Sequence, residues 1–313
     1  MIWAGLLVMI VSESATLLRV EPFWSWNTPI AWTGFILFAD GVAFRARGHS
    51  WIRSSPREFA LLVLVSIPLW LAFEAYNLVI RNWYYTGLPE NAALRAFGYG
   101  WSFATITPAI FEGAELVGVM RGSGRSGKPG RPGEPGGSNR SGNSAASLRS
   151  KSDLPDPPGL PGPPGLPGPP GPPDLPGLVS IAAGAIMLAS PFFVSPEVAR
   201  YMAAPVWLGF IFLLDPINAW LGAESLWIDL RAARYDRLVN LSLSGFLCGA
   251  LWEFWNFWAG AKWHYSVPIM ERWKIFEMPL PGYFGFPPFA LECFTMYVFV
   301  RRLVTRGGRA IGR

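Results

Sequence analysis

Residues 251–268, LWEFWNFWAGAKWHYSVP, place one glutamate and one asparagine inside a run that is mostly apolar and aromatic. Residues 71–89, LAFEAYNLVIRNWYYTGLP, repeat this pattern. The two acid–amide pairs are Glu253 with Asn256 and Glu74 with Asn77. Because residues three apart are neighbours on a helix surface, each pair shares one helix face. The two stretches therefore predict a duplicated polar site inside an apolar helical bundle.

The composition is that of an integral membrane protein. Of the 313 residues, 51% are hydrophobic and 15% are charged, whereas about 25% are charged in soluble domains. About 20 apolar residues cross a bilayer as a helix. Eight stretches of this kind occur, at residues 2–18, 28–44, 58–80, 97–119, 178–194, 203–222, 238–260 and 283–302. We therefore predict an all-α, polytopic bundle of about eight transmembrane helices, in which the first stretch is a retained helix rather than a signal peptide.

The positive charges predict the orientation in the membrane. Most of the 26 lysine and arginine residues lie between the second and third stretches, between the sixth and seventh, in the centre of the chain and after the eighth stretch. Cytoplasmic loops are enriched in these residues. We expect a multi-pass protein of the cell membrane whose termini and central linker are cytoplasmic. The net charge of +5 follows from this orientation, and no nucleic-acid partner is expected.

The centre of the chain, residues 121–177, predicts a linker. Glycine recurs at every third position through Gly124–Gly136 and again through Gly159–Gly171, in runs rich in proline. This is the period of collagen, in which only glycine fits the axis of the triple helix. A disordered, extended linker is favoured, and a trimerising stalk is the alternative. The linker separates a first membrane repeat (1–120) from a second (178–313).

The sequences on either side of the linker match in order, residue type and spacing. The matched pairs are Trp32 and Trp207, Asp40 and Asp215, Glu74 and Glu253, Asn77 and Asn256, Trp83 and Trp263, Tyr85 and Tyr265, Pro108 and Pro288, and Glu112 and Glu292. This order indicates an internal duplication of a four-helix unit. Since four is an even number, both repeats share one orientation, and we expect them to be related by an axis along the membrane normal.

Six of the matched residues are carboxylates inside apolar stretches: Asp40, Glu74, Glu112, Asp215, Glu253 and Glu292. An ionised acid at this depth is costly, so each should face the bundle interior, find a partner or stay protonated. Asp40 and Asp215 suit a supporting, structural role as well as a functional one. The four glutamates cluster with polar aromatic residues, which favours function, although buried acid–amide pairs can also simply hold helices together. A protonated glutamate bonded to its amide neighbour has the environment of a general acid.

The order of these residues resembles the lycopene cyclase domain, the repeat of small membrane-embedded carotenoid cyclases. The shared pattern is an acid, a Trp-x-Tyr motif about nine residues later, and a proline followed by an acid on the next helix. It covers Glu74–Tyr85 with Pro108–Glu112, and Glu253–Tyr265 with Pro288–Glu292. The family has adjacent acids after its proline, where this chain has one, and its first acid is usually aspartate. Its usual unit has three helices instead of four.

The resemblance implies non-redox closure of a carotenoid end group by an isomerase of the intramolecular lyase type. An acid protonates a terminal double bond, the cation cyclises, and a base removes a proton. Glu253 or Glu74 is then the expected acid, and Glu292 or Glu112 the base or cation stabiliser. The expected substrate-binding residues are Asn256, Asn77, Trp252, Trp255, Trp263, Tyr265, Trp83 and Tyr85. The expected partners are a hydrophobic carotenoid or lipid substrate and the bilayer.

No cofactor or metal is expected, because the two histidines cannot supply the ligand cluster of a membrane di-iron enzyme, and Cys248 and Cys293 lack metal-type spacing. Two alternatives stay open. In a carotenoid hydratase, water would capture the same cation. In a proton-coupled transporter built on duplicated halves, Pro108 and Pro288 would break the helices at the site. The sequence predicts no oligomeric state.

Overall fold

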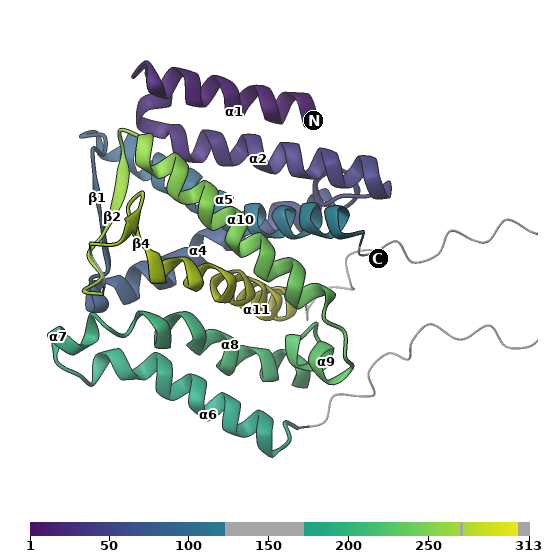
Figure 1. Ribbon diagram of the computed structural model, residues 1–313. Coiled ribbons are helices and arrows are strands. Elements are labelled where there is room, and N and C mark those ends of the chain that lie inside the picture. The colour runs from purple at the N-terminus through teal and green to yellow at the C-terminus, as the bar shows by residue number, and fades with distance from the viewer. Residues whose placement is uncertain (123–171, 270–271, 306–313) are drawn as a thin grey trace, which may run out of the picture.

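The computed structural model describes residues 1–122, 172–269 and 272–305 (Figure 1). This part of the chain is mostly helical, as predicted. The main helices are α1 (Ile2–Leu17), α2 (Phe23–Arg47), α4 (Pro56–Ile80), α5 (Ala92–Arg121), α6 (Leu175–Ala189), α8 (Ala203–Trp220), α10 (Asp236–Trp258) and α11 (Phe286–Thr305). The shorter elements are α3 (Trp51–Ser54), α7 (Pro196–Ala199), α9 (Leu226–Arg231), the 3-10 helices η1 (Ser190–Phe192) and η2 (Leu280–Gly285), and the strands β1 (Trp83–Thr86), β2 (Lys262–Tyr265), β3 (Lys274–Ile275) and β4 (Met278–Pro279). The collagen-like part of the predicted linker lies outside the described residues.

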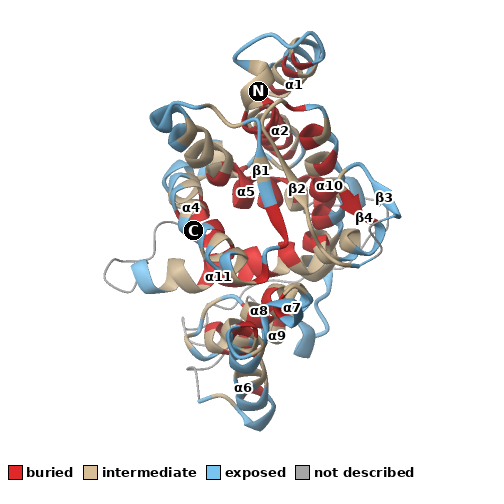
Figure 2. Cartoon of the chain, turned by 90° about the vertical axis from the view of Figure 1, so that its left-hand side faces the viewer, coloured by how far each residue is buried: buried red, intermediate tan, exposed pale blue. Residues whose placement is uncertain are grey.

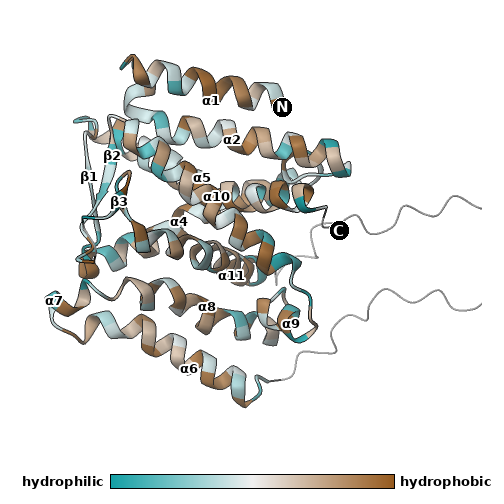
Figure 3. Cartoon of the chain, viewed as in Figure 1, coloured by the Kyte–Doolittle hydropathy of each residue, from teal (hydrophilic) through white to brown (hydrophobic). Residues whose placement is uncertain are grey.

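Each of the eight predicted apolar stretches coincides with a main helix. Six helical segments are long and apolar enough to cross a membrane: α4, α5, α6 together with η1 (Leu175–Phe192), α8, α10, and α11 together with η2 (Leu280–Val304). Helix α1 has only 16 residues, and α2 is not among the six. Figure 3 shows apolar residues along the main helices and hydrophilic residues on β1 and β2. The described chain is therefore a helical membrane protein with six helices, rather than the expected eight, that meet the requirements of a span.

The main helices lie side by side, with α1 and α2 on one flank and α6 and α8 on the other (Figures 1 and 2). In the first half, α1 packs on α2, and α5 packs on both α2 and α4. In the second half, α6 packs on α8, and α11 packs on both α8 and α10. The halves meet where α5 contacts α10 and α4 contacts α11. The buried core lies at this centre and includes Phe73, Ile110 and Ala290.

Two glycines let α10 approach α11 closely. A Cβ atom at Gly245 would overlap the backbone of Phe286, and a Cβ atom at Gly249 would overlap its ring. This is the close helix contact that a small-xxx-small spacing predicts. It places the Phe286 ring against α10 one helical turn before Glu253.

Strands β1 and β2 join the two halves at one end of the bundle, named here the strand end (Figure 2). They are antiparallel, and the partners are Trp83 with Tyr265, Tyr84 with His264, Tyr85 with Trp263, and Thr86 with Lys262. Tyr84 stacks on His264 with ring centroids 5.3 Å apart. The sequence predicts aromatic residues here but not strands, because the two segments are far apart in the chain and their pairing leaves no local pattern.

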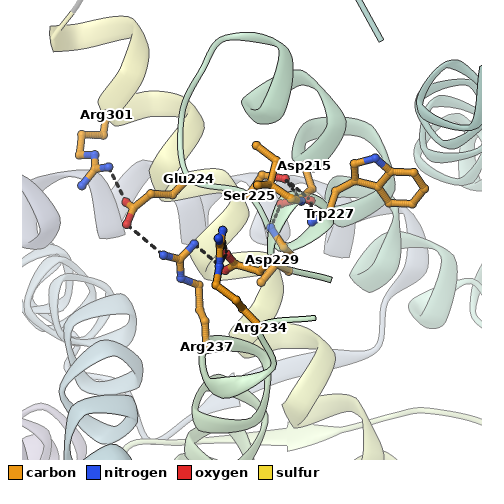
Figure 4. Close-up of polar contacts among 10 residues, drawn as sticks. Asp215, Glu224, Ser225, Trp227, Asp229, Arg234, Arg237 and Arg301 are labelled. Carbon is orange, nitrogen blue, oxygen red and sulfur yellow. Dashed lines mark hydrogen bonds and ion pairs between the residues drawn. The ribbon is translucent and has the colours of Figure 1, made fainter. Parts of the chain in front are cut away.

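Ion pairs hold the opposite end of the bundle, named here the arginine-rich end (Figure 4). Arg301 on α11 donates to Glu58 on α4 and to Glu224 before α9, at 2.7 and 2.6 Å. Arg121 on α5 lies 3.5 Å from Asp236 on α10. Contacts from α11 to α4 and from α5 to α10 therefore join the two halves at this end as well.

Asp40 and Asp215 each hold a short helix at the arginine-rich end. The Asp215 carboxylate accepts hydrogen bonds from the backbone N–H groups of Leu226 and Trp227, at 2.8 and 2.7 Å (Figure 4). Asp40 accepts from the backbone N–H of Ile52 at 2.9 Å. Because the first N–H groups of a helix have no partner within it, each acid satisfies the start of the short helix that follows its own. These contacts are structural.

Cysteines placed at Tyr84 and His264 should form a disulfide when oxidised, because directly opposed residues of an antiparallel pair have Cβ atoms about 4.5–5.5 Å apart. In a Tyr84→Cys/His264→Cys variant with a protease site inserted in the linker, the cleaved halves should migrate as one band on a non-reducing gel. The matched control is Tyr84→Cys/Lys262→Cys, which is two residues out of register and should cross-link less. Equal cross-linking of the two variants would contradict the register.

Candidate functional site

Glu253 on α10 is fully buried. The hydroxyl of Tyr265 donates to Glu253 Oε1 at 2.8 Å, and the indole N–H of Trp263 donates to the Tyr265 hydroxyl oxygen at 2.9 Å. Among the described residues, Glu253 Oε2 has no hydrogen-bond partner. A buried carboxylate needs several donors, whereas a protonated carboxyl needs fewer. The site of Glu253 therefore suits a carboxyl that carries a proton.

Glu74, at the matching position on α4, is half-buried and has more donors. Its Oε1 accepts from the indole N–H groups of Trp70 and Trp83, at 2.8 and 3.1 Å, and from the hydroxyl of Tyr85 at 2.5 Å. Hydrogen bonds to the charged form of an acid stabilise that form. Three donors on one oxygen therefore suit an ionised carboxylate.

The difference between the two glutamates has a cause in the sequence. Four residues before Glu74 stands Trp70, one helical turn away, so its indole reaches the carboxylate. Four residues before Glu253 stands Gly249, which has no side chain. The ring of Phe286 occupies the space that a side chain at this position would need. The glycine that allows α11 to approach α10 thus removes a donor from the second glutamate.

Asn77 and Asn256 do not orient the glutamates, contrary to the prediction. Asn256 Oδ1 accepts from the backbone N–H of Trp263, and its Nδ2 donates to the carbonyl oxygen of Trp263, both at 2.9 Å. Asn77 bonds the backbone of Trp83 in the same way, at 3.2 and 2.8 Å. Because an amide side chain offers both an acceptor and a donor, each asparagine fixes the start of the strand that follows its helix, at the first residue of β1 and at the second residue of β2. The asparagines therefore place the strands.

An aromatic pocket lies at the strand end between β1, β2 and helices α2, α4, α5, α8, α10 and α11. It encloses about 1030 Å³ of space, its open mouth included. Seven tryptophans line it: Trp26, Trp32, Trp70, Trp83, Trp207, Trp252 and Trp263. Tyr85 and Tyr265 also line it, whereas Glu74 and Glu253 do not. Tyr265 therefore connects Glu253 to the pocket, and Tyr85 connects Glu74 to it together with the indoles of Trp70 and Trp83.

Burial raises the pKa of Tyr265 and of Tyr85 well above the ordinary tyrosine value, and the neighbouring glutamate acts in the same direction in each case. Both hydroxyls are accordingly protonated at neutral pH. Each can act as the hydrogen-bond donor that the distances to Glu253 and Glu74 describe.

The other two predicted catalytic residues, Glu112 and Glu292, are fully buried and do not line the pocket. Among the described residues, their carboxyl oxygens have no hydrogen-bond partner. Glu112 lies near Asp40, and Glu292 lies near the backbone of Phe210 on α8. The structure thus brings Glu253 and Glu74 to the pocket through their tyrosines and leaves Glu112 and Glu292 elsewhere in the bundle.

Trp252 and Trp255, both expected to bind substrate, lie in different places. Trp252 lines the pocket and contacts Trp70, with ring centroids 5.6 Å apart. Trp255 is buried against Trp32, with ring centroids 4.8 Å apart, and does not line the pocket. Only the first can touch a molecule in the pocket.

Sequence reasoning missed three features of this site. One is the hydrogen bond from Trp70 to Glu74, although a spacing of four residues is a signal for such a contact. Another is the role of Tyr85 and Tyr265, which were expected to bind substrate and not to link the acids to the pocket. The third is that Arg95 and Lys262 line the pocket. No local pattern could have shown this, because the two residues come from different halves of the chain.

Among the described residues, no group of three or more histidine, cysteine, aspartate or glutamate side chains could hold a metal ion. Comparisons with known protein families, with curated proteins and with solved structures give no match. The function of the site is therefore inferred from its own geometry.

Replacing Asn256 by alanine should lower the free energy of unfolding by about 2–4 kcal/mol, because two hydrogen bonds are lost and a peptide group in the bundle is left without partners. Unfolding in mixed detergent and SDS micelles measures the change. Asn77→Ala is the matched variant, and its loss should be smaller, because Asn77 is only half-buried and water can replace the amide. Wild-type stability of Asn256→Ala would contradict the role of the amide in placing β2.

The hydroxyls of Tyr85 and Tyr265 should ionise only above the usual tyrosine range of about pH 10. Since their pKa values are raised in the folded state, their contribution to stability is constant below about pH 10 and is lost as the pH rises further. An ultraviolet titration of tyrosinate, compared between the wild type and Tyr265→Phe, gives the pH at which the missing hydroxyl ionises. Ionisation of Tyr265 below the usual range would contradict its burial as a donor.

Proposed function

We propose that this chain is an integral membrane enzyme that carries out acid–base chemistry on a hydrophobic isoprenoid, and that the reaction is cyclisation of a carotenoid end group. One observation carries the proposal. Tyr265 lines an aromatic pocket, and its hydroxyl is bonded to the fully buried Glu253, whose second oxygen has no hydrogen-bond partner among the described residues. A proton on Glu253 can thus reach the apolar pocket through a single group, the Tyr265 hydroxyl. The resemblance to the lycopene cyclase domain points to the same chemistry.

The reaction begins with proton transfer to the terminal double bond of the polyene. For this step the hydrogen bond between the two groups reverses, so that protonated Glu253 donates to the Tyr265 oxygen and the Tyr265 O–H turns toward the alkene. The Tyr265 hydroxyl then gives its proton to one alkene carbon and takes the proton of Glu253, which becomes a carboxylate. The other alkene carbon becomes a cation, and the electrons of an inner double bond form the ring C–C bond to it. The positive charge moves into the ring, and loss of a ring proton restores a double bond. The reaction is an isomerisation that needs no oxidant or reductant.

Glu74 and Tyr85 are placed to take the second proton. Tyr85 lies on β1, opposite Trp263 of β2, so the two tyrosines enter the same pocket from paired strands. The Tyr85 oxygen can accept the ring proton while its own proton passes to Glu74, which is 2.5 Å away. The donor-rich Glu74 is then the base and the donor-poor Glu253 the acid. This replaces the earlier expectation that Glu292 or Glu112 is the base.

The aromatic wall suits a cationic intermediate. Trp70, Trp83, Trp252 and Trp263 surround the tyrosines, and Trp252 contacts Trp263 with ring centroids 5.2 Å apart. A cation over an indole face gains about 1–2 kcal/mol when it is desolvated. The same rings exclude water, which would otherwise capture the cation and give the hydrated product.

We infer further that the two halves are repeats related by an axis along the membrane normal and that all eight main helices cross the membrane. The strand register supports a two-fold relation, because Tyr84 pairs with its own counterpart, His264. The helix contacts support it too, because in each half a glycine of the first helix lies against a glycine of the second: Gly5 on Gly34, and Gly184 on Gly209. With the arginine-rich end in the cytoplasm, the pocket would face the outer side.

Expression in a bacterium that accumulates lycopene tests the proposed reaction. The wild-type chain should convert the pigment to a cyclised carotenoid. Glu253→Gln and Tyr265→Phe should each lower conversion by about 10²–10⁴-fold, the range of general acid catalysis, because each removes a transferable proton and little volume. Glu197→Gln, an exposed glutamate on α7, is the matched control and should convert normally.

Pigment analysis separates the outcomes of this test. A hydrated carotenoid from the wild-type chain would support the same proton transfer with water as the capturing group, which is the hydratase. Normal conversion by a well-expressed Glu253→Gln protein would contradict the assigned role of Glu253.

Proton-coupled transport is a second candidate, and a separate observation favours it. A second cavity opens at the arginine-rich end, lined by Phe111, Tyr297 and Arg301 among others. Glu112 directly follows Phe111 and is buried without a hydrogen-bond partner among the described residues. A buried acid next to a cavity is a feature of proton carriers. Absence of pigment conversion, together with proton-dependent uptake into vesicles, would favour this function over the enzyme.

A further inference from the structure

Three donors of α2 that face no acceptor belong to residues that line the aromatic pocket. They are the indole N–H groups of Trp26 and Trp32 and the hydroxyl of Thr28, none of which has a hydrogen-bond partner among the described residues. Thr28 and Trp32 are more than nine-tenths buried. Indole nitrogens donate and do not accept, and native proteins keep few buried donors unpaired. The α2 side of the pocket therefore lacks an oxygen acceptor.

Two cations line the same pocket, and among the described residues each is hydrogen-bonded to a backbone carbonyl oxygen. The Lys262 ammonium also lies 5.4 Å from the centroid of the Phe257 ring. Arg95 on α5 donates to the carbonyl oxygen of Pro89 at 3.3 Å, and Lys262 on β2 donates to the carbonyl oxygen of Phe257 at 2.8 Å. Within the described ranges, neither forms an ion pair with a carboxylate. Both are half-buried. Two cations without counter-charges beside an apolar pocket create a positive potential that complements an anion.

These groups gather at the mouth of the pocket. Pro89, the partner of Arg95, lies in the loop after β1, and Lys262 pairs with the last residue of β1. Gly98 follows Arg95 by one turn on α5, and a Cβ atom at Gly98 would lie 3.2 Å from the indole nitrogen of Trp26. Arg95, Lys262 and Trp26 thus reach one pocket from three elements, α5, β2 and α2.

We propose that this mouth binds an anionic oxygen group, a carboxylate or a phosphate, at one end of an amphiphile whose apolar chain lies among the tryptophans. The acid would receive hydrogen bonds from Arg95, Lys262 and the α2 donors. The preferred substrate is then an isoprenoid with one acidic end, and a pure hydrocarbon is a weaker ligand of the same pocket. This inference rests on the proposed function only in taking the pocket as the substrate site.

Quenching of tryptophan fluorescence in the detergent-purified full chain measures the binding. The first probe pair is a C20 polyene carboxylic acid, all-trans-retinoic acid, and its methyl ester, which keeps the chain and loses the charge. The second pair, used as competitors, is geranylgeranyl phosphate and geranylgeraniol. In at least one pair the anion should bind tighter by about tenfold or more, as charge-assisted hydrogen bonds predict. The pair that shows the preference identifies the head as carboxylate or phosphate.

Substitution locates the preference. In Arg95→Gln/Lys262→Gln the affinity for the anion should fall to that for its neutral partner, while the affinity for the neutral partner stays the same. Arg81→Gln is the matched control, because Arg81 is an exposed cation just before β1 that does not line the pocket. This control should keep the full preference.

Equal affinities for the anionic and neutral members of both pairs in the wild type would overturn the inference, and so would a preference that persists in the double variant. The comparison of anionic and neutral probes on the wild-type chain does not depend on whether any variant folds. If the chain converts lycopene but binds the anionic and neutral probes equally, the proposed function stands and the inference of an acidic head group is wrong. If the chain binds the anion tightly but converts no polyene, the site for an acidic head group stands and the proposed cyclase function is wrong.

Discussion

The antiparallel pairing of β1 with β2 is the contact on which the rest of the structure depends. It joins the two halves at the strand end, and it presents Tyr85 and Tyr265 to one pocket. The two asparagines in front of the strands bond the backbone at the start of each strand, Trp83 in β1 and Trp263 in β2, so helix and strand are held in a fixed relation. Without this pairing the tyrosyl hydroxyls would have no defined position between acid and pocket.

Glu74 and Glu253 occupy matching positions in the two halves but have different hydrogen-bond donors around them. Because burying an acid is costly, these donors decide which form of each carboxyl is favoured. Glu74 receives three donors and Glu253 receives one. One of the two missing donors follows from a position that is tryptophan in the first half and glycine in the second. The other is missing because the indole N–H of Trp263 donates to the Tyr265 hydroxyl, whereas that of Trp83 donates to Glu74. In an apolar bundle the number of donors decides whether the charged or the neutral form of a carboxyl is favoured. We propose that these unequal donors make Glu253 an acid and Glu74 a base, each joined to the one pocket through its tyrosine, which is what a proton-initiated cyclisation requires.

Much of the fold could be predicted from the sequence, because the signals are local. Apolar length marks all eight helices, and a glycine spacing marks the contact of α10 with α11. The interior position of the acids follows from the cost of a charge in lipid. The strand pairing, the partners of Asn77 and Asn256 and the mouth formed by Arg95 and Lys262 could not be predicted. Each depends on residues from both halves or on a turn whose geometry the sequence does not encode locally.

In the proposed reaction, a proton from an acid that exchanges with solvent starts ring closure. Conversion of the polyene in D₂O, after equilibration of the protein in the same solvent, shows the origin of this proton by mass spectrometry of the product. One deuterium is expected for each ring closed, at the carbon that receives the proton. Product without deuterium would mean that ring closure does not begin with protonation by the enzyme.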